Sequence, residues 1–117
     1  MKYKKIVTDF FILMALTTNI SFIVSPNPYE LVITVATNLA ATILKVGEGR
    51  VLSTEMLASS LVADLHLIPA LFVFFVGDQV EAVGLAQGAL AANIISVIIS
   101  IIETVLSAFT EEEGSNS

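Results

Sequence analysis

Four long apolar stretches, separated by short polar connections, follow one another along the chain. They run from about residues 6 to 24, 28 to 46, 52 to 76 and 82 to 106. A helix needs about 20 mainly apolar residues to cross the hydrocarbon core of a bilayer, so each stretch is long enough for one crossing. The pattern therefore predicts an all-α fold, a transmembrane four-helix bundle that forms a single domain over residues 1–109.

Turn-forming residues mark the connections between these stretches. Asn27 is suited to cap a helix that begins at Pro28, because proline fits the first position of a helix. Glycines in the segments 47–50 and 77–79 permit the left-handed backbone conformation with which helices often end. The last stretch is followed by three glutamates and small polar residues, and we expect residues 110–117 to form an acidic disordered tail.

The basic residues predict the orientation of the bundle. All five of them lie at the N-terminus or close to the second connection, and they are Lys2, Lys4, Lys5, Lys45 and Arg50. With four spans these two regions lie on the same side of the membrane. Because basic residues favour the cytoplasmic side, we expect the N and C termini to be cytoplasmic.

Each predicted span carries one strongly polar residue near its middle: Asn19, Asn38, Asp64 and Asn93. Counted from the cytoplasmic ends, these residues lie about 14 to 20 Å into a core of about 30 Å, so they can form one polar layer. Such a layer either lines an ion path or joins helices by hydrogen bonds. For the asparagines we favour hydrogen bonding. An intramembrane carboxylate needs water, a proton or a partner, which makes Asp64 the main functional candidate.

His66 lies close to Asp64 in sequence and is a further candidate for the polar layer. The two residues are two positions apart, about 200° around a helix, so they do not form a catalytic dyad. With no second histidine and no cysteine, the sequence gives no support to a metal site. It also contains no motif that pairs a nucleophile with a base and no phosphate-binding loop. We therefore predict that the protein is not an enzyme and binds no cofactor.

Small residues recur every four positions in the last span. This stripe favours close contact between helix backbones, within the chain or between copies. Its members are Gly84, Gly88, Ala92, Ser96 and Ser100.

The composition agrees with a membrane protein and excludes some partners. Of 117 residues, 56% are apolar and only 14% are charged, compared with about 25% charged in soluble domains. The net charge of −6 argues against nucleic acid, because no basic surface is available to neutralise phosphates.

Three runs of residues, 29–31, 38–45 and 57–70, resemble a family of small uncharacterised bacterial inner-membrane proteins with four spans. The resemblance implies an integral protein of the bacterial inner membrane and transfers no functional residue.

Two functions are compatible with these features. The first is an oligomeric cation-conducting channel or transport subunit that uses Asp64, with Asn38 and Asn93 as possible lining. Four spans enclose little space, so a conducting path would need a homo-oligomer. The second is an accessory or assembly subunit that packs on a larger membrane transport complex through the small-residue stripe and conducts nothing. In both cases the lipid bilayer is a partner.

Overall fold

The computed structural model of the protein describes residues 3–46 and 51–116, with side chains described for residues 3–46 and 54–109. Four α-helices account for nearly all of these residues: α1 (Tyr3–Val24), α2 (Pro28–Lys45), α3 (Val51–Phe75) and α4 (Gln79–Asn116). The predicted all-α class and the order of the four helices are confirmed. The predicted connection at 47–50 lies outside the described residues.

Local capping explains where the helices begin and end. Oδ1 of Asn27 accepts a hydrogen bond of 2.9 Å from the amide of Glu30, and Pro28 follows as the first helical residue of α2, as the sequence predicted. Gly77 ends α3 with a φ of 99°, a left-handed conformation that glycine adopts without strain. The amide of Glu81 donates to Oδ1 of Asp78 at 3.0 Å, which caps the start of α4.

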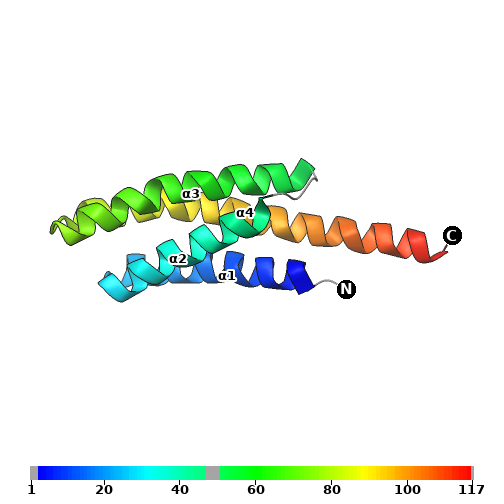
Figure 1. The fold of residues 1–117 in the computed structure, drawn as a ribbon, viewed down its shortest axis with the longest axis horizontal. Helices are drawn as coiled ribbons and strands as arrows, with labels where there is room; N and C mark the ends of the chain where they lie inside the picture. Colours follow the sequence, from blue (N-terminus) through cyan, green and yellow to red (C-terminus); the bar gives the residue numbers. More distant parts are fainter. Residues whose placement is uncertain (1–2, 47–50, 117) are drawn as a thin grey trace.

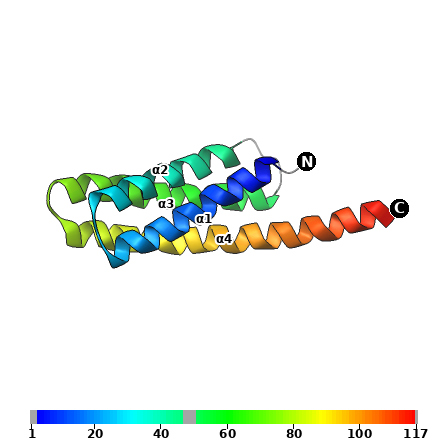
Figure 2. The ribbon, with the colours of Figure 1, turned by 90° about the horizontal axis from the view of Figure 1, so that it is seen from below.

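The helices run alternately up and down and form a ring in which each helix packs on two others. Consecutive helices pack on each other, and α1 closes the ring by packing on α4. The two views of the ribbon show that the bundle is elongated and that both α1 and α3 begin at the same end, which we call the N-terminal end (Figures 1 and 2). The molecule measures 60 × 20 × 18 Å along its principal axes.

The buried positions of each helix alternate at spacings of three and four residues. In α4 this buried seam contains only small or polar side chains, and in α3 it mixes small and large residues. An average spacing of about 3.5 residues is the repeat of helices that pack side by side in left-handed bundles. The seam of α4 consists of Ala82, Ala86, Ala89, Asn93, Ser96, Ser100 and Glu103, and that of α3 consists of Met56, Ser60, Ala63, Leu67 and Ala70.

Three of the four helices are long and apolar enough to cross a membrane, over Tyr3–Val24, Thr54–Phe75 and Gln79–Phe109. The sequence predicted four spans, but α2 does not meet the same criteria. It has 18 residues and carries Glu30 and Lys45 as well as a row of buried polar side chains. The outer surface supports a membrane location, because large apolar side chains such as Leu65, Phe72 and Ile101 are exposed.

The last helix is much longer than the others. Its 38 residues span about 57 Å, and Figure 2 shows its C-terminal part continuing beyond the N-terminal end of the bundle. The sequence predicted a disordered tail from residue 110, whereas α4 continues to Asn116. A helix that is already formed extends by one hydrogen bond per added residue, and glutamate is a good helix former, so the acidic segment continues the helix.

Candidate functional site

The main polar contact inside the bundle joins α2 to α3. Thr42 Oγ1 donates to Oδ2 of Asp64 at 2.7 Å. Lys45 Nζ donates to Ser60 Oγ and, at 3.5 Å, to the carbonyl of Met56. Asp64 is only 7% exposed and Lys45 only 2%. Lys45 is one of the basic residues near the second connection, and the structure places its ammonium group between two helices.

Asp64 and Lys45 bring opposite charges into the same interface, and they are close enough to interact electrostatically. Removing an ion from water costs several kcal/mol, a cost that an opposite charge and hydrogen bonds can offset. The compensation is incomplete at one atom. Oδ1 of Asp64 is buried and has no hydrogen-bond partner among the described residues. It is therefore the atom at which a proton or a cation would bind.

A second polar contact joins α1 to α4 on the other side of the ring. With its amide oriented to match the surrounding donors and acceptors, Asn19 donates to the carbonyl of Ala86 at 3.1 Å. In this orientation its oxygen accepts from Asn93 Nδ2 at 3.0 Å and from the amide of Leu90 at 3.1 Å. Asn38 instead donates to a carbonyl of its own helix at 2.8 Å. The described contacts thus divide the predicted polar layer into two separate pairs of helices.

His66 contacts α4 and not the site of Asp64. Its Nδ1 lies 2.8 Å from the carbonyl of Val62, and its ring lies over Gly88. A Cβ atom added to Gly88 would come within 2.5 Å of Cδ2 and 2.8 Å of Nε2 of the His66 ring. Gly88 is therefore the position in α4 where the absence of a side chain makes room for a neighbour.

The small-residue stripe lies only partly in the packed face of α4. Ala92, Ser96 and Ser100 are buried, and Ser96 Oγ is 2.6 Å from Ser59 Oγ of α3. Gly84 is exposed, and nothing lies within 4 Å of a Cβ placed there. A step of four residues turns about 40° past a full circle, so a row with that spacing drifts around the helix. The seam with spacings of three and four residues stays on one face.

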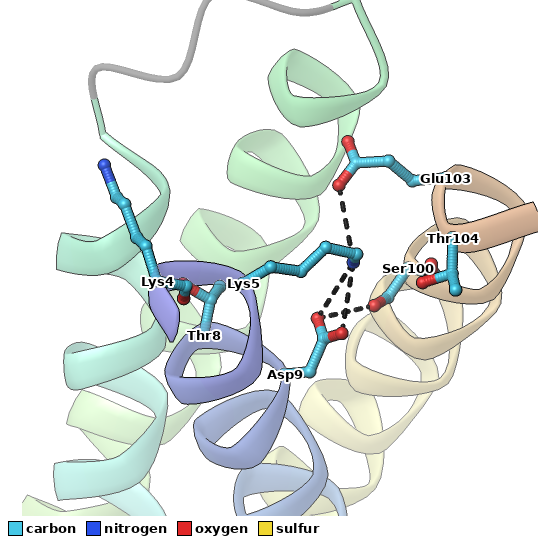
Figure 3. A network of polar contacts seen from close by, with 7 residues as sticks. All are labelled: Lys4, Lys5, Thr8, Asp9, Ser100, Glu103 and Thr104. Atoms are coloured by element: carbon cyan, nitrogen blue, oxygen red, sulfur yellow. Dashed lines mark hydrogen bonds and ion pairs between the residues drawn. The ribbon is translucent and has the colours of Figure 1, made fainter. Parts of the chain in front are cut away.

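A third polar network lies at the N-terminal end of the bundle, between α1 and α4 (Figure 3). Lys5 Nζ is 3.1 Å from Oδ2 of Asp9 and 3.7 Å from Oε1 of Glu103. Ser100 Oγ donates to Oδ1 of Asp9 at 2.8 Å. One lysine of α1 thus lies between a carboxylate of its own helix and one of α4, and the hydroxyl of Ser100 makes a second tie between the same helices.

A groove of about 370 Å³ opens beside this network along the line where α1 meets α4. Its polar lining is Asp9, Ser100 and Thr104, and its apolar lining includes Leu13 and Ile101. The side chain of Asp9 is 30% exposed, so this carboxylate is accessible although it is already hydrogen-bonded. The groove combines an apolar wall with a polar end.

The sequence analysis did not single out Asp9 or Glu103. The signal was present, because Lys5 and Asp9 are four residues apart and lie on the same helix face. Glu103 has no cation near it in sequence, so its partner depends on the packing of the last helix on the first. Among the residues that the structure describes, no cluster of three or more histidine, cysteine or carboxylate side chains could hold a metal ion.

Comparison with known proteins assigns the chain to a protein family. No curated protein and no solved structure matches the sequence. Residues 25–104 match a family of unknown function, DUF6394, and this match extends over α2, α3 and the whole buried seam of α4. Because the match covers more than half of the sequence, the chain belongs to the DUF6394 family.

Proposed function

We propose that this protein is a small integral membrane subunit that packs on a larger membrane protein and forms no conduction path of its own. One observation carries the proposal. The Asp64 carboxylate is turned into its own bundle, where it accepts a hydrogen bond from Thr42 and lies near Lys45. A carboxylate that lines a path shared by several copies would instead face outward from each bundle.

The interior contacts favour a structural role for the polar residues. Hydroxyl, amide and charged side chains link α2 to α3, α3 to α4 and α1 to α4. Interhelical hydrogen bonds are one of the forces that hold helices together in lipid, where water gives no hydrophobic driving force between them. The polar residues then fix the bundle, and the exposed apolar surface remains for lipid and for a partner protein.

The proposed membrane arrangement has four spans with both termini in the cytoplasm of a bacterial cell. The 18 residues of α2 extend about 27 Å, close to the thickness of the hydrocarbon core. Glu30 lies in the first turn of α2, and Lys45 in its last turn faces Ser60 of α3 instead of lipid. A homo-oligomer is compatible with this arrangement, and its copies would meet through exposed apolar side chains.

A second function is favoured by the unpartnered oxygen of Asp64. Oδ1 is buried without a hydrogen-bond partner in the described part of the chain, and intramembrane carboxylates often mark ion or proton pathways. In this alternative the protein conducts or helps to transport a cation, with Asp64 as the binding group. The adjacent Lys45 charge weakens the attraction of a cation, which places this function second.

Flux through proteoliposomes separates the two functions. The purified protein is reconstituted, and K⁺, Na⁺ and H⁺ fluxes are measured under both signs of membrane potential. The proposal predicts no flux above that of empty liposomes. A wild-type flux above that of empty liposomes would overturn the proposal. Loss of that flux in Asp64→Asn protein that still has its helix signal, with the flux retained in Asn38→Ala, would establish the transport function.

A further inference from the structure

We propose that the groove between α1 and α4 binds a phospholipid whose headgroup carries a primary ammonium, as phosphatidylethanolamine does. The inference assigns a ligand to a surface that the proposed function does not use. It requires only that this chain lies in a bilayer, which its three long apolar helices support.

The order of side chains along the groove matches the order of groups in a phospholipid. Lys5, Asp9 and Leu13 follow one another at intervals of four residues on one face of α1, or about 6 Å of helix length each. On α4, Thr104 and Ser100 lie toward the N-terminal end and Val97 lies deeper. An amphipathic ligand would therefore place its headgroup near Lys5 and Asp9 and its acyl chain along Leu13 and Val97.

The charges at this end favour a headgroup that carries a cation. The described ion pairs at this end join one cation, Lys5, to two carboxylates, Asp9 and Glu103 (Figure 3). The carboxylate that lines the groove itself is Asp9, so the part of the headgroup that enters the groove should be cationic.

The hydrogen bonding of Asp9 favours a headgroup with N–H donors. Oδ1 of Asp9 accepts from Ser100 at 2.8 Å and lies 3.4 Å from Lys5 Nζ, whereas Oδ2 accepts only from Lys5 among the described contacts, at 3.1 Å. A carboxylate oxygen has two lone pairs, so Oδ2 can accept one more hydrogen bond. A primary ammonium can donate that bond. A quaternary ammonium of phosphatidylcholine carries the same charge but has no N–H group.

The test compares lipids that differ only in the headgroup. Delipidated full-length protein in a neutral detergent is incubated with equal amounts of phosphatidylethanolamine, phosphatidylcholine and phosphatidylglycerol of identical acyl chains, and the retained lipids are counted by native mass spectrometry. We expect phosphatidylethanolamine to be retained about five-fold more than phosphatidylcholine, a ratio that corresponds to about 1 kcal/mol. Equal retention of these two lipids, or a preference for phosphatidylglycerol, would overturn the proposal.

Variants then test whether this preference arises in the groove. Asp9→Asn should abolish the five-fold ratio. Glu103→Gln is the matched control, because Glu103 also pairs with Lys5 but does not line the groove, and it should preserve the ratio. Ile101→Trp places a large ring on the exposed wall and should reduce retention of all three lipids. A ratio that survives Asp9→Asn, or retention unchanged in Ile101→Trp, would place the lipid elsewhere, with the groove left to another occupant such as a partner helix.

Discussion

The two glycines in the first half of α4 should respond in opposite directions to the same substitution. Gly88 lies under the ring of His66, and a Cβ atom added there would be 2.5 Å from Cδ2 of that ring. Gly84 lies one turn away on the same helix with open space around it. Replacing glycine by alanine inside a helix stabilises it by roughly 0.5–1 kcal/mol if nothing is in the way.

The expected change in the free energy of unfolding for Gly88→Ala follows from the contact between this position and the His66 ring. Overpacking of a well-packed interface typically costs about 1–3 kcal/mol, and this cost exceeds the helix-propensity gain over most of that range. We therefore expect Gly84→Ala to stabilise the bundle by up to about 1 kcal/mol and Gly88→Ala to destabilise it by about 1 kcal/mol. The free energy of unfolding would be measured by titrating the protein from mild detergent into SDS and following the loss of helix signal.

A double-mutant cycle identifies the cause. In a His66→Ala background the ring is gone, so Gly88→Ala should become stabilising, as at Gly84, and the coupling energy between the two positions should be about 1–3 kcal/mol. If both glycine substitutions are equally stabilising in the wild-type background, the contact between the His66 ring and Gly88 does not limit packing, and the reasoning is wrong.

Three other outcomes follow from the described contacts. Asp64→Asn should destabilise the bundle by about 3 kcal/mol because it removes the buried carboxylate charge that attracts Lys45, and the loss should shrink in a Lys45→Met background, as SDS titration of all four combinations would show. Equal losses in both backgrounds would show that the two charges do not stabilise each other. A double-mutant cycle of Asn19→Ala and Asn93→Ala should give a coupling energy of about 0.6–1.7 kcal/mol, the range measured for hydrogen bonds between membrane helices. A coupling energy of zero would show that the hydrogen bond between these two side chains does not stabilise the bundle. Reporter fusions at residue 117 and within 47–50 should be cytoplasmic, whereas a fusion at Asn27 should be outside, and an external C-terminus would contradict the four-span arrangement.

The helices themselves could be predicted because they depend on local signals. Long apolar runs, turn residues and the Asn27 cap act within a few residues of sequence, and the structure has α2 beginning at Pro28 as expected. The acidic tail was predicted less well. Its composition resembles a disordered segment, but its neighbour is a helix that is already formed, and the helix continues to Asn116.

The polar contacts could not be predicted in the same way, because they depend on which faces of distant helices meet. Thr42 and Lys45 lie on the face of α2 that packs on α3. Their helical spacing indicates a polar face that avoids lipid, but no local signal identifies Asp64 and Ser60 as the residues that this face contacts. Asn19 pairs with Asn93, which is separated from it by two other helices in the sequence. A periodicity analysis at about 3.5 residues in place of four would have identified the buried face of α4, including Glu103.

The contact between Lys45 and α3 has a consequence for biosynthesis. During translation α2 emerges before α3, so Lys45 enters the membrane before Ser60 and Asp64 have been made. Until then its ammonium cannot make the contacts with Ser60 and with the carbonyl of Met56 that hold it against α3 in the finished bundle. The first hairpin should therefore wait at the insertion machinery, or sit shallowly in the membrane, and reach its final depth only together with the second hairpin. The unit of insertion would then be the whole bundle and not the single helix.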